Sequence, residues 1–185
     1  MVKTNSMFLE LGTQLPSFEM INTNSSNQEN YNLSKLDNRH LLLMFICAHC
    51  PFVKYIENHI SILSSDIENK IQTIAISSND IDKYPQDGPL EMTKHAKKNK
   101  YDFPYLFDET QSVAKIYDAA CTPDIYLYNL NNILVYRGQI DDSRPGNNIP
   151  LSGNDLINAI ECLINMEENK KTQKPSIGCN IKWKS

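Results

Sequence analysis

One stretch of sequence decides the fold: Leu41-Leu42-Leu43-Met44-Phe45-Ile46-Cys47-Ala48-His49-Cys50-Pro51-Phe52-Val53. Its first six residues are apolar and do not alternate with polar ones, which is typical of a central strand buried on both faces. Two cysteines separated by two residues follow directly. The stretch therefore predicts a buried strand that ends at a pair of thiols.

The hydrophobic period changes after the cysteines. Apolar residues recur at helical spacing and predict an amphipathic helix from Phe52 to about Glu68; they are Val53, Ile56, Ile60, Leu63 and Ile67. A second buried strand is expected over Ile71–Ser77. The cysteines thus belong at a strand-to-helix junction inside a strand–helix–strand unit.

The rest of the chain extends this pattern on both sides. Further strands are expected over 15–22, 103–107, 125–128 and 133–137, the last two joined by the hairpin turn at 129–132. Residues 23–32 predict a loop or hairpin tip, and 78–88 a polar loop. Helices are expected over 89–100, over 112–117, and from a capping box at Ser152 to about Glu168. This order predicts an α/β fold with a central mixed sheet flanked by helices. One domain spans 1–170, followed by a Lys-rich tail over 171–185.

Length and composition limit the function classes. The 185 residues suit one ordinary domain, with 41% hydrophobic and 22% charged residues. A net charge of −4 gives no sign of a nucleic acid or an anionic membrane as partner. Residues 1–14 have no apolar segment typical of a secretory signal, so we expect a cytoplasmic protein. In that reducing compartment a close cysteine pair is more often catalytic or metal-binding than structural.

The Cys-x-x-Cys pair points to redox chemistry. Unpaired backbone N–H groups and the helix dipole stabilise a thiolate at a helix N-terminus. We predict that Cys47 is the nucleophile and that Cys50 resolves the mixed disulfide. His49 lies between them, and its imidazolium would favour a thiolate on Cys47; the alternative is a side chain that points to solvent.

Two structural interpretations compete with redox chemistry: inert thiols, or half of a zinc site. A zinc site needs four ligands at suitable spacing, whereas Cys121, Cys162 and Cys179 stand alone in the sequence. We therefore expect no metal. No Gly-rich phosphate loop or dinucleotide fingerprint is present, so no nucleotide cofactor is expected and electrons must come from an external dithiol system.

The whole pattern resembles the thioredoxin superfamily, in its peroxiredoxin-like branch, the alkyl hydroperoxide reductase/thiol-specific antioxidant group. The residues at 44–53 are similar to a bacterial subgroup with the site Cys-x-His-Cys-Pro-Phe-Val. Further blocks are similar to that subgroup, and they lie at 11–18, 33–36, 75–80, 103–109, 120–124, 137–147 and 174–184. The resemblance implies a thioredoxin-like fold with an N-terminal hairpin extension.

The resemblance also implies roles for Thr122 and Pro123. Pro123 corresponds to the cis-proline that faces the redox site, and the backbone of Thr122 would pair with an extended substrate segment. The sequence departs from the family's motifs at two points, and these weaken the expectation of a general thioredoxin activity and of a peroxidase activity. The Trp-Cys-Gly-Pro-Cys site of a thioredoxin is absent, and Cys47 occupies the Thr position of the peroxiredoxin motif Pro-x-x-x-Thr-x-x-Cys if Cys50 aligns with the peroxidatic cysteine.

The other thiols and two arginines leave alternatives open. Cys121 is either a packed small side chain or a third redox thiol. Cys179 is either a distant resolving thiol in a flexible tail, or part of a tail that packs through Ile177, Ile181 and Trp183. Cys162 is expected to be a bystander. Arg137 and Arg144 either approach a thiolate or an acidic group on a partner, or they form loop salt bridges with Asp141 or Asp142.

We therefore predict a thiol–disulfide oxidoreductase that reduces or exchanges protein or small-molecule disulfides through Cys47 and Cys50. A thiol peroxidase that reduces hydroperoxides, with an antioxidant role, is the first alternative. The second alternative is a redox sensor or metal-handling protein.

Overall fold

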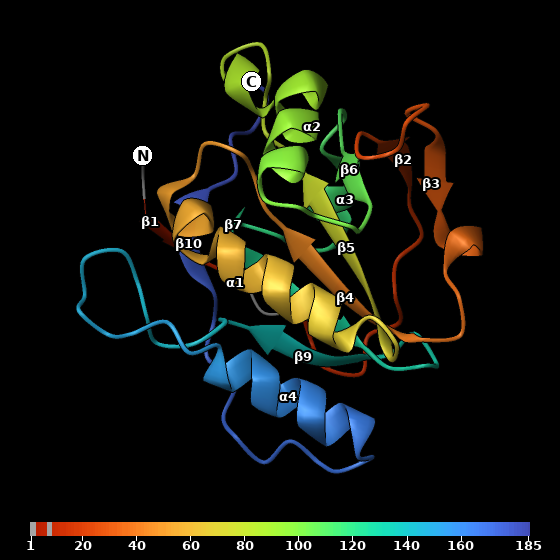
Figure 1. Ribbon diagram of the computed structural model, residues 1–185, viewed down its shortest axis with the longest axis vertical. Helices are drawn as coiled ribbons and strands as arrows, with labels where there is room; N and C mark the ends of the chain where they lie inside the picture. The colour runs from red at the N-terminus through yellow and green to blue at the C-terminus, as the bar shows by residue number, and fades with distance from the viewer. Residues whose placement is uncertain (1–2, 7–8) are drawn as a thin grey trace.

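The computed structural model describes residues 3–6 and 9–185, which form two sheets with helices packed on both faces of the larger one (Figure 1). The strands are β1 (Lys3–Asn5), β2 (Glu19–Asn22), β3 (Asn30–Asn32), β4 (His40–Phe45), β5 (Ile71–Ser77), β6 (Tyr105–Phe107), β7 (Cys121–Thr122), β8 (Asp124–Tyr128), β9 (Leu134–Gly138) and β10 (Ile177–Asn180). The helices are α1 (Pro51–Ile67), α2 (Pro89–Lys98), α3 (Ser112–Ile116) and α4 (Asn154–Ile164).

The seven-stranded sheet has the order β3-β2-β6-β5-β4-β8-β9. Strand β4 lies near its centre, parallel to β5 and antiparallel to β8, so the sheet is mixed as predicted. The N-terminal hairpin expected from the family resemblance is the antiparallel pair β2 and β3. Among the helices of the described residues, none combines the length and apolar character that crossing a bilayer requires.

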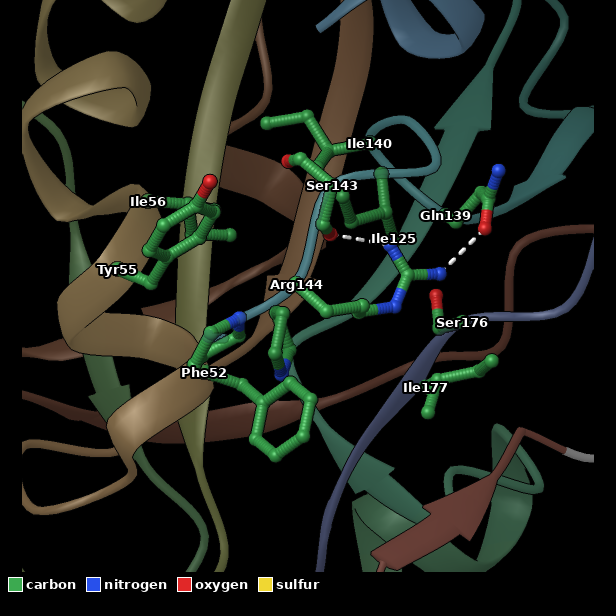
Figure 2. Close-up of a pocket in the computed structure, with 12 residues that line it drawn as sticks. Phe52, Tyr55, Ile56, Ile125, Gln139, Ile140, Ser143, Arg144, Ser176 and Ile177 are labelled. Atoms are coloured by element: carbon green, nitrogen blue, oxygen red, sulfur yellow. Dashed lines mark hydrogen bonds between the residues drawn. The ribbon is translucent and has the colours of Figure 1, made fainter. Parts of the chain in front are cut away.

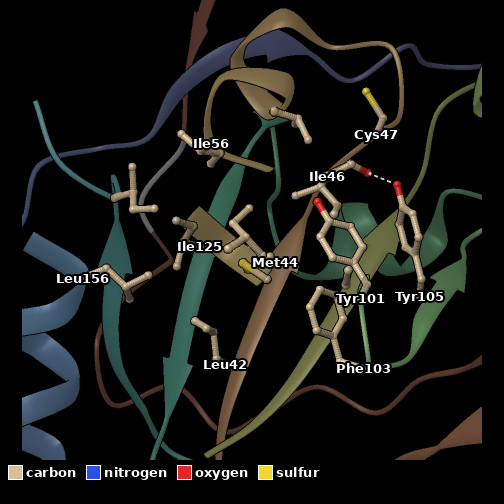
Figure 3. Packing of buried hydrophobic residues seen from close by; sticks show 14 of the residues in the cluster. Leu42, Met44, Ile46, Cys47, Ile56, Tyr101, Phe103, Tyr105, Ile125 and Leu156 are labelled. Atoms are coloured by element: carbon tan, nitrogen blue, oxygen red, sulfur yellow. Dashed lines mark hydrogen bonds between the residues drawn. The ribbon is translucent and has the colours of Figure 1, made fainter. Parts of the chain in front are cut away.

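Strand β4 divides the core because its side chains alternate between the two faces of the sheet. Leu42 and Met44 pack with residues of α1, α2 and α4 on one face. Leu41, Leu43 and Phe45 pack with residues of α3 on the other. Figure 3 shows the first of these clusters, in which Met44 and Ile46 lead up to Cys47. The uninterrupted apolar run therefore reflects burial on both faces.

Helix α1 begins one residue after the second cysteine. Cys50 is its N-cap, in an extended conformation with φ −65° and ψ 123°, and Pro51 occupies the first turn, where its missing N–H costs nothing. Val53, Ile56 and Ile60 face the core. The predicted helix from Phe52 to about Glu68 is thus confirmed to within one residue at each end.

Several predicted boundaries were too generous. The strand expected over 15–22 is regular only from Glu19, and the one expected over 103–107 begins at Tyr105. The loop at 78–88 contains a 3₁₀ turn over Pro85–Asp87. The two strand starts differ from the predicted ones by four and two residues, and the predicted elements keep their order.

The capping box predicted at Ser152 does not form. Helix α4 begins at Asn154, and its N-cap is Gly153, with a φ of +70° that favours glycine. The backbone N–H groups of Ser152 and Gly153 instead donate to the carboxylate of Asp141, at 2.6 and 2.7 Å. The helix ends at Ile164, earlier than expected.

The C-terminal tail is part of the folded structure. Strand β10 pairs antiparallel with β1 on one side and with β7 on the other, which gives a small sheet of order β1-β10-β7. Cys179 and Ile181 are buried, whereas Trp183 is 40% exposed. Of the two alternatives for the tail, the packed one is therefore correct, and the expectation of a flexible tail is wrong.

Candidate functional site

The cysteine pair lies where β4 ends and α1 begins, in the middle of the large sheet. Both thiols are almost fully buried, with 1% of Cys47 and none of Cys50 exposed. The short loop that carries them lies against the Thr122–Pro123 peptide bond, which is cis as expected. Sequence positions 47–50 and 121–123 thus meet at one end of the central strands.

Thr122 contacts both sulfurs. Its hydroxyl oxygen lies 3.5 Å from Sγ of Cys47, and its carbonyl oxygen lies 3.2 Å from Sγ of Cys50, which can donate to it as a thiol. The expectation that the Thr122 backbone is open to a substrate segment is not met, because β10 already occupies that edge. In the pairing of β10 with β7, Cys179 lies opposite Thr122.

Electrostatics favour a negative charge on Cys50. Its pKa is lowered from 9.0 to about 5, chiefly by the hydrogen bond from the thiol of Cys47, with further donors in Thr122, Cys179 and the backbone N–H of Val53. Burial opposes this shift. The helix N-terminus and the donors that converge on Cys50 therefore favour the thiolate form of this residue.

Cys47 is affected in the opposite sense. Its pKa is raised well above the ordinary value, first because its thiol donates to Cys50, then because it is buried and faces the carboxylate of Asp87. We predicted the stabilised thiolate on Cys47; the contacts place it on Cys50. A hydrogen bond from Cys47 to Cys50 links the two sulfurs, and the sulfur that attacks substrate stays a prediction.

His49 is held in place by a buried carboxylate and does not point freely to solvent. Its Nδ1 lies 2.5 Å from Oδ2 of Asp87, its backbone N–H donates to Oδ1 at 3.2 Å, and its ring stacks on Tyr84. Asp87 also accepts a hydrogen bond from Asn79 at 2.8 Å. The same Nδ1 lies 3.9 Å from Sγ of Cys47. Cys47, His49 and Asp87 therefore form a connected row.

Asp87 is the residue that sequence reasoning missed. It belongs to the polar loop at 78–88, and no motif around it signals a contact with His49, 38 residues away in the chain. Its only sequence peculiarity is its place before Gly88-Pro89, which signals a turn and helix start, not a buried carboxylate.

The donor atoms of Cys47, His49 and Asp87 lie within 4.8 Å of one another and could converge on a metal ion. The 2.5 Å contact between His49 and Asp87, however, is that of a hydrogen bond. Two ligands of a tetrahedral zinc ion with bonds near 2.0 Å lie about 3.3 Å apart. The contact with Asp87 orients the imidazole of His49, and we assign no metal to these three residues.

The remaining predicted thiols differ in position. Cys179 is buried beside Cys50, and burial together with the hydrogen bond to Cys50 raises its pKa to about 12. Cys121 is buried on β7, where its thiol lies 3.6 Å from the carbonyl oxygen of Pro123, and burial raises its pKa strongly. Cys162 is on α4, with Asn158 as its contact. The site thus contains three neighbouring sulfurs, those of residues 47, 50 and 179.

Neither arginine forms the loop salt bridge suggested for it. Arg137 is buried and pairs with the buried carboxylate of Asp124 at 3.4 Å, below the cis-proline, and it lies over the ring of Tyr126. Arg144 donates to the backbone oxygen of Asp141 and to the side chain of Gln139. Arg137 therefore supports the strand behind Thr122–Pro123, and it does not approach a thiolate.

A largely apolar hollow adjoins the cis-proline Pro123. It is lined by Phe52, Tyr55, Ile56, Pro123, Ile125, Gln139, Ile140, Ser143, Arg144, Pro145, Ser176 and Ile177. Figure 2 shows the guanidinium of Arg144 between Ser143 and Gln139, to both of which it donates hydrogen bonds. This hollow adjoins the Thr122–Pro123 bond, against which the cysteine pair lies.

Comparison with known proteins identifies relatives of the whole chain. Residues 11–137 match the model of the AhpC/TSA family. An uncharacterized conserved protein from Geobacillus kaustophilus is 44% identical, with a TM-score of 0.95 over 100% of this chain and 97% of that one. A hypothetical protein from Sinorhizobium meliloti 1021 is 38% identical, with a TM-score of 0.94 over 98% and 99% of the two chains. No curated protein matches.

More distant structures share the fold alone. A putative thiol:disulfide interchange protein DsbE from Chlorobium tepidum is 15% identical, with a TM-score of 0.67 over 85% of this chain and 99% of that one. Peroxidoxin BcpB from Mycobacterium tuberculosis is 16% identical, with a TM-score of 0.57 over 69% and 84% of the chains. The thioredoxin-like fold with a mixed central sheet is thereby confirmed.

Proposed function

Because the chain belongs to the AhpC/TSA family, we propose that it is a thiol–disulfide oxidoreductase that reduces or exchanges disulfides through Cys47 and Cys50. The observation that carries the proposal is the pair of buried cysteines at the N-terminus of α1, with both sulfurs in contact with Thr122 of the cis Thr122–Pro123 bond. A thiol with a pKa of about 5 is about 99% ionised at pH 7, so the pair is charged at physiological pH without any cofactor.

In the proposed reaction Cys47 is the attacking sulfur. The hydroxyl of Thr122 and the imidazole of His49 are its neighbours, and His49 is 15% exposed, whereas Cys50 lies beneath Thr122 and Cys179. Transfer of the Cys47 proton to Cys50 along their hydrogen bond moves the negative charge to Cys47. That step makes Cys47 a nucleophile, and it returns Cys50 to the thiol form.

The electrons balance over two exchange steps. The Cys47 thiolate attacks one sulfur of the substrate disulfide, the substrate S–S bond breaks, and the released substrate sulfur takes up a proton. Cys50 then loses its proton and attacks Sγ of Cys47. The Cys47–Cys50 disulfide forms, the second substrate thiol leaves, and an external dithiol regenerates the pair.

His49 and Asp87 act on this reaction as positioning residues. Asp87 fixes the imidazole through both its ring nitrogen and its backbone N–H, so Nδ1 stays near Cys47. A charged imidazolium in this position favours a thiolate on Cys47, while the carboxylate of Asp87 disfavours it. The carboxylate of Asp87 thus helps to keep Cys47 protonated until its proton passes to Cys50.

Trapping of the mixed disulfide tests the proposal. Wild type, Cys47→Ser, Cys50→Ser and the matched control Cys162→Ser are compared in reduction of a model protein disulfide with dithiothreitol as donor. We expect turnover in wild type and control, none in the two site variants, and a stable mixed disulfide on Cys47 in Cys50→Ser. Full turnover in Cys47→Ser would overturn the proposal.

A thiol peroxidase is the second candidate, and the low pKa of Cys50 favours it. A Cys50 thiolate attacks a hydroperoxide, which gives a sulfenic acid and an alcohol or water, and Cys47 then condenses with it to form a disulfide and release water. The same four proteins are assayed for hydrogen peroxide consumption with dithiothreitol. Fast consumption that survives Cys47→Ser and disappears in Cys50→Ser would replace the first proposal by this one.

A further inference from the structure

We propose that Cys179 is a third redox thiol. It attacks Cys50 in the Cys47–Cys50 disulfide and replaces Cys47 as the disulfide partner of Cys50. This inference rests on the proposed function in one respect, since the Cys47–Cys50 disulfide is its starting point. The product is a Cys50–Cys179 disulfide and a Cys47 that is again a thiol. Strand β10 is then covalently attached to the N-terminus of α1.

The position of β10 is the first support. Its residues pair antiparallel with β7, so Cys179 lies opposite Thr122, the residue that contacts both Cys47 and Cys50. Side chains of directly opposed residues in an antiparallel pair lie on the same face, so the Cys179 side chain lies on the same face as that of Thr122. The chain thus places one of its own cysteines beside the Cys47–Cys50 pair.

Gly178 allows β10 to lie close to Thr122 of β7. A Cβ atom at this position would lie 2.0 Å from the carbonyl oxygen of Thr122, a distance that no side chain can occupy. Its φ is not in the left-handed range, so glycine is required here by the contact and not by the backbone conformation. The neighbouring residue Cys179 is thereby pressed against the redox site.

Cys50 is the central sulfur of three. It accepts from the thiol of Cys47 on one side and interacts with the thiol of Cys179 on the other. All three side chains belong to the same buried cluster, and α1 packs against β10. Cys121 differs, because its thiol faces the carbonyl oxygens of Pro123 and Ser176. Cys179, and not Cys121, is therefore the thiol that can exchange with the Cys47–Cys50 disulfide.

The exchange is balanced without any added oxidant or reductant. Cys179 gives up its proton and attacks Sγ of Cys50 in the Cys47–Cys50 disulfide. The S–S bond between Cys47 and Cys50 breaks, that between Cys50 and Cys179 forms, and Cys47 takes up the proton. Because burial raises the pKa of Cys179, little of it is ionised at neutral pH, and we expect this step to be slower than closure of the first disulfide.

Peptide mapping under non-reducing conditions tests the inference. Trypsin places Cys47 and Cys50 on the peptide 40–54 and Cys179 on the peptide 172–182, since the Lys174–Pro175 bond resists cleavage. Cys47→Ser, oxidised with one equivalent of diamide, is expected to link these two peptides within one molecule. Cys47→Ser/Cys179→Ser is expected to give no link. In wild type, the link is expected to appear after the Cys47–Cys50 disulfide and at its expense.

The outcomes separate this inference from the proposed function. If wild type forms the Cys47–Cys50 disulfide but Cys47→Ser yields only Cys50 bonded to added glutathione, the inference is overturned and the proposed function stands. If wild type forms no Cys47–Cys50 disulfide at all, the proposed function fails. A link from Cys50 to the peptide that carries Cys121 would also overturn the assignment of Cys179. Unchanged circular dichroism of each variant serves as the folding control.

Discussion

Replacement of Cys50 by serine in the reduced protein removes the sulfur that holds the negative charge at the N-terminus of α1. The pKa of Cys50 is lowered to about 5, first by the hydrogen bond from Cys47. A lowered folded-state pKa contributes stability that is fully present above the unfolded pKa and is lost as the pH falls through the folded one. With about 1.4 kcal/mol for each pKa unit, ionisation of Cys50 adds about 2 kcal/mol between pH 5 and pH 7.

Urea-induced unfolding in the presence of a phosphine reductant measures this quantity. The free energy of unfolding is determined at pH 5, 6 and 7 for wild type, Cys50→Ser and the control Cys162→Ser. We expect the difference between wild type and Cys50→Ser to grow by about 2 kcal/mol over this range, and the control to follow wild type. Cys47 does not interfere, because its raised pKa leaves it protonated in both states at these pH values.

Two results would refute the reasoning. A difference that stays constant from pH 5 to pH 7 would mean that Cys50 does not ionise in this range. A thiolate absorbance that appears only above pH 8 in reduced wild type would place the charge outside the contacts described here. In Cys47→Ala, loss of the donor that lowers the Cys50 pKa most should move the absorbance step to higher pH.

Three further changes test neighbouring parts of the site. Asp87→Asn removes a charge that raises the Cys47 pKa, so alkylation of Cys47 by iodoacetamide, followed by peptide mass spectrometry, should extend to lower pH; an unchanged pH profile would contradict this. Arg137→Met leaves the carboxylate of Asp124 buried without its charged partner, so it should lower the free energy of unfolding by about 3 to 5 kcal/mol. Urea titration measures this change, and a loss below about 1 kcal/mol would contradict the prediction. Gly178→Ala forces β10 away from β7, which should lower the free energy of unfolding by about 1 to 3 kcal/mol. It should also speed alkylation of Cys179. Equal alkylation rates in the variant and in wild type would argue against the close contact.

The parts of the fold that could be predicted from the sequence are those fixed by local patterns. The apolar run at 41–46 and the helical spacing after Pro51 depend only on neighbouring residues, and both elements were located to within one or two residues. The order of strands and helices then limited the topology to a mixed sheet. The cysteine pair was found because its spacing is itself a local signal.

The rest depends on contacts between distant segments. Asp87 reaches His49 through a loop without a motif, and Arg137 pairs with Asp124 because both point inward from neighbouring antiparallel strands. The family resemblance placed Thr122 beside the pair, but it did not reveal that β10 covers this residue. A Lys-rich composition favours an open tail, whereas the pairing of β10 with two strands depends on partners more than 50 residues away.

The small sheet β1-β10-β7 also has a consequence for biosynthesis. A ribosome releases the chain from its N-terminus, and domains fold as their residues emerge. The seven-stranded sheet, α1 and the cysteine pair are all complete before residues 177–180 are made. Until then β7 lacks its partner strand, and Thr122, which contacts both sulfurs, lacks the backbone pairing that β10 gives it. Strand β10 closes this edge of β7 when it emerges.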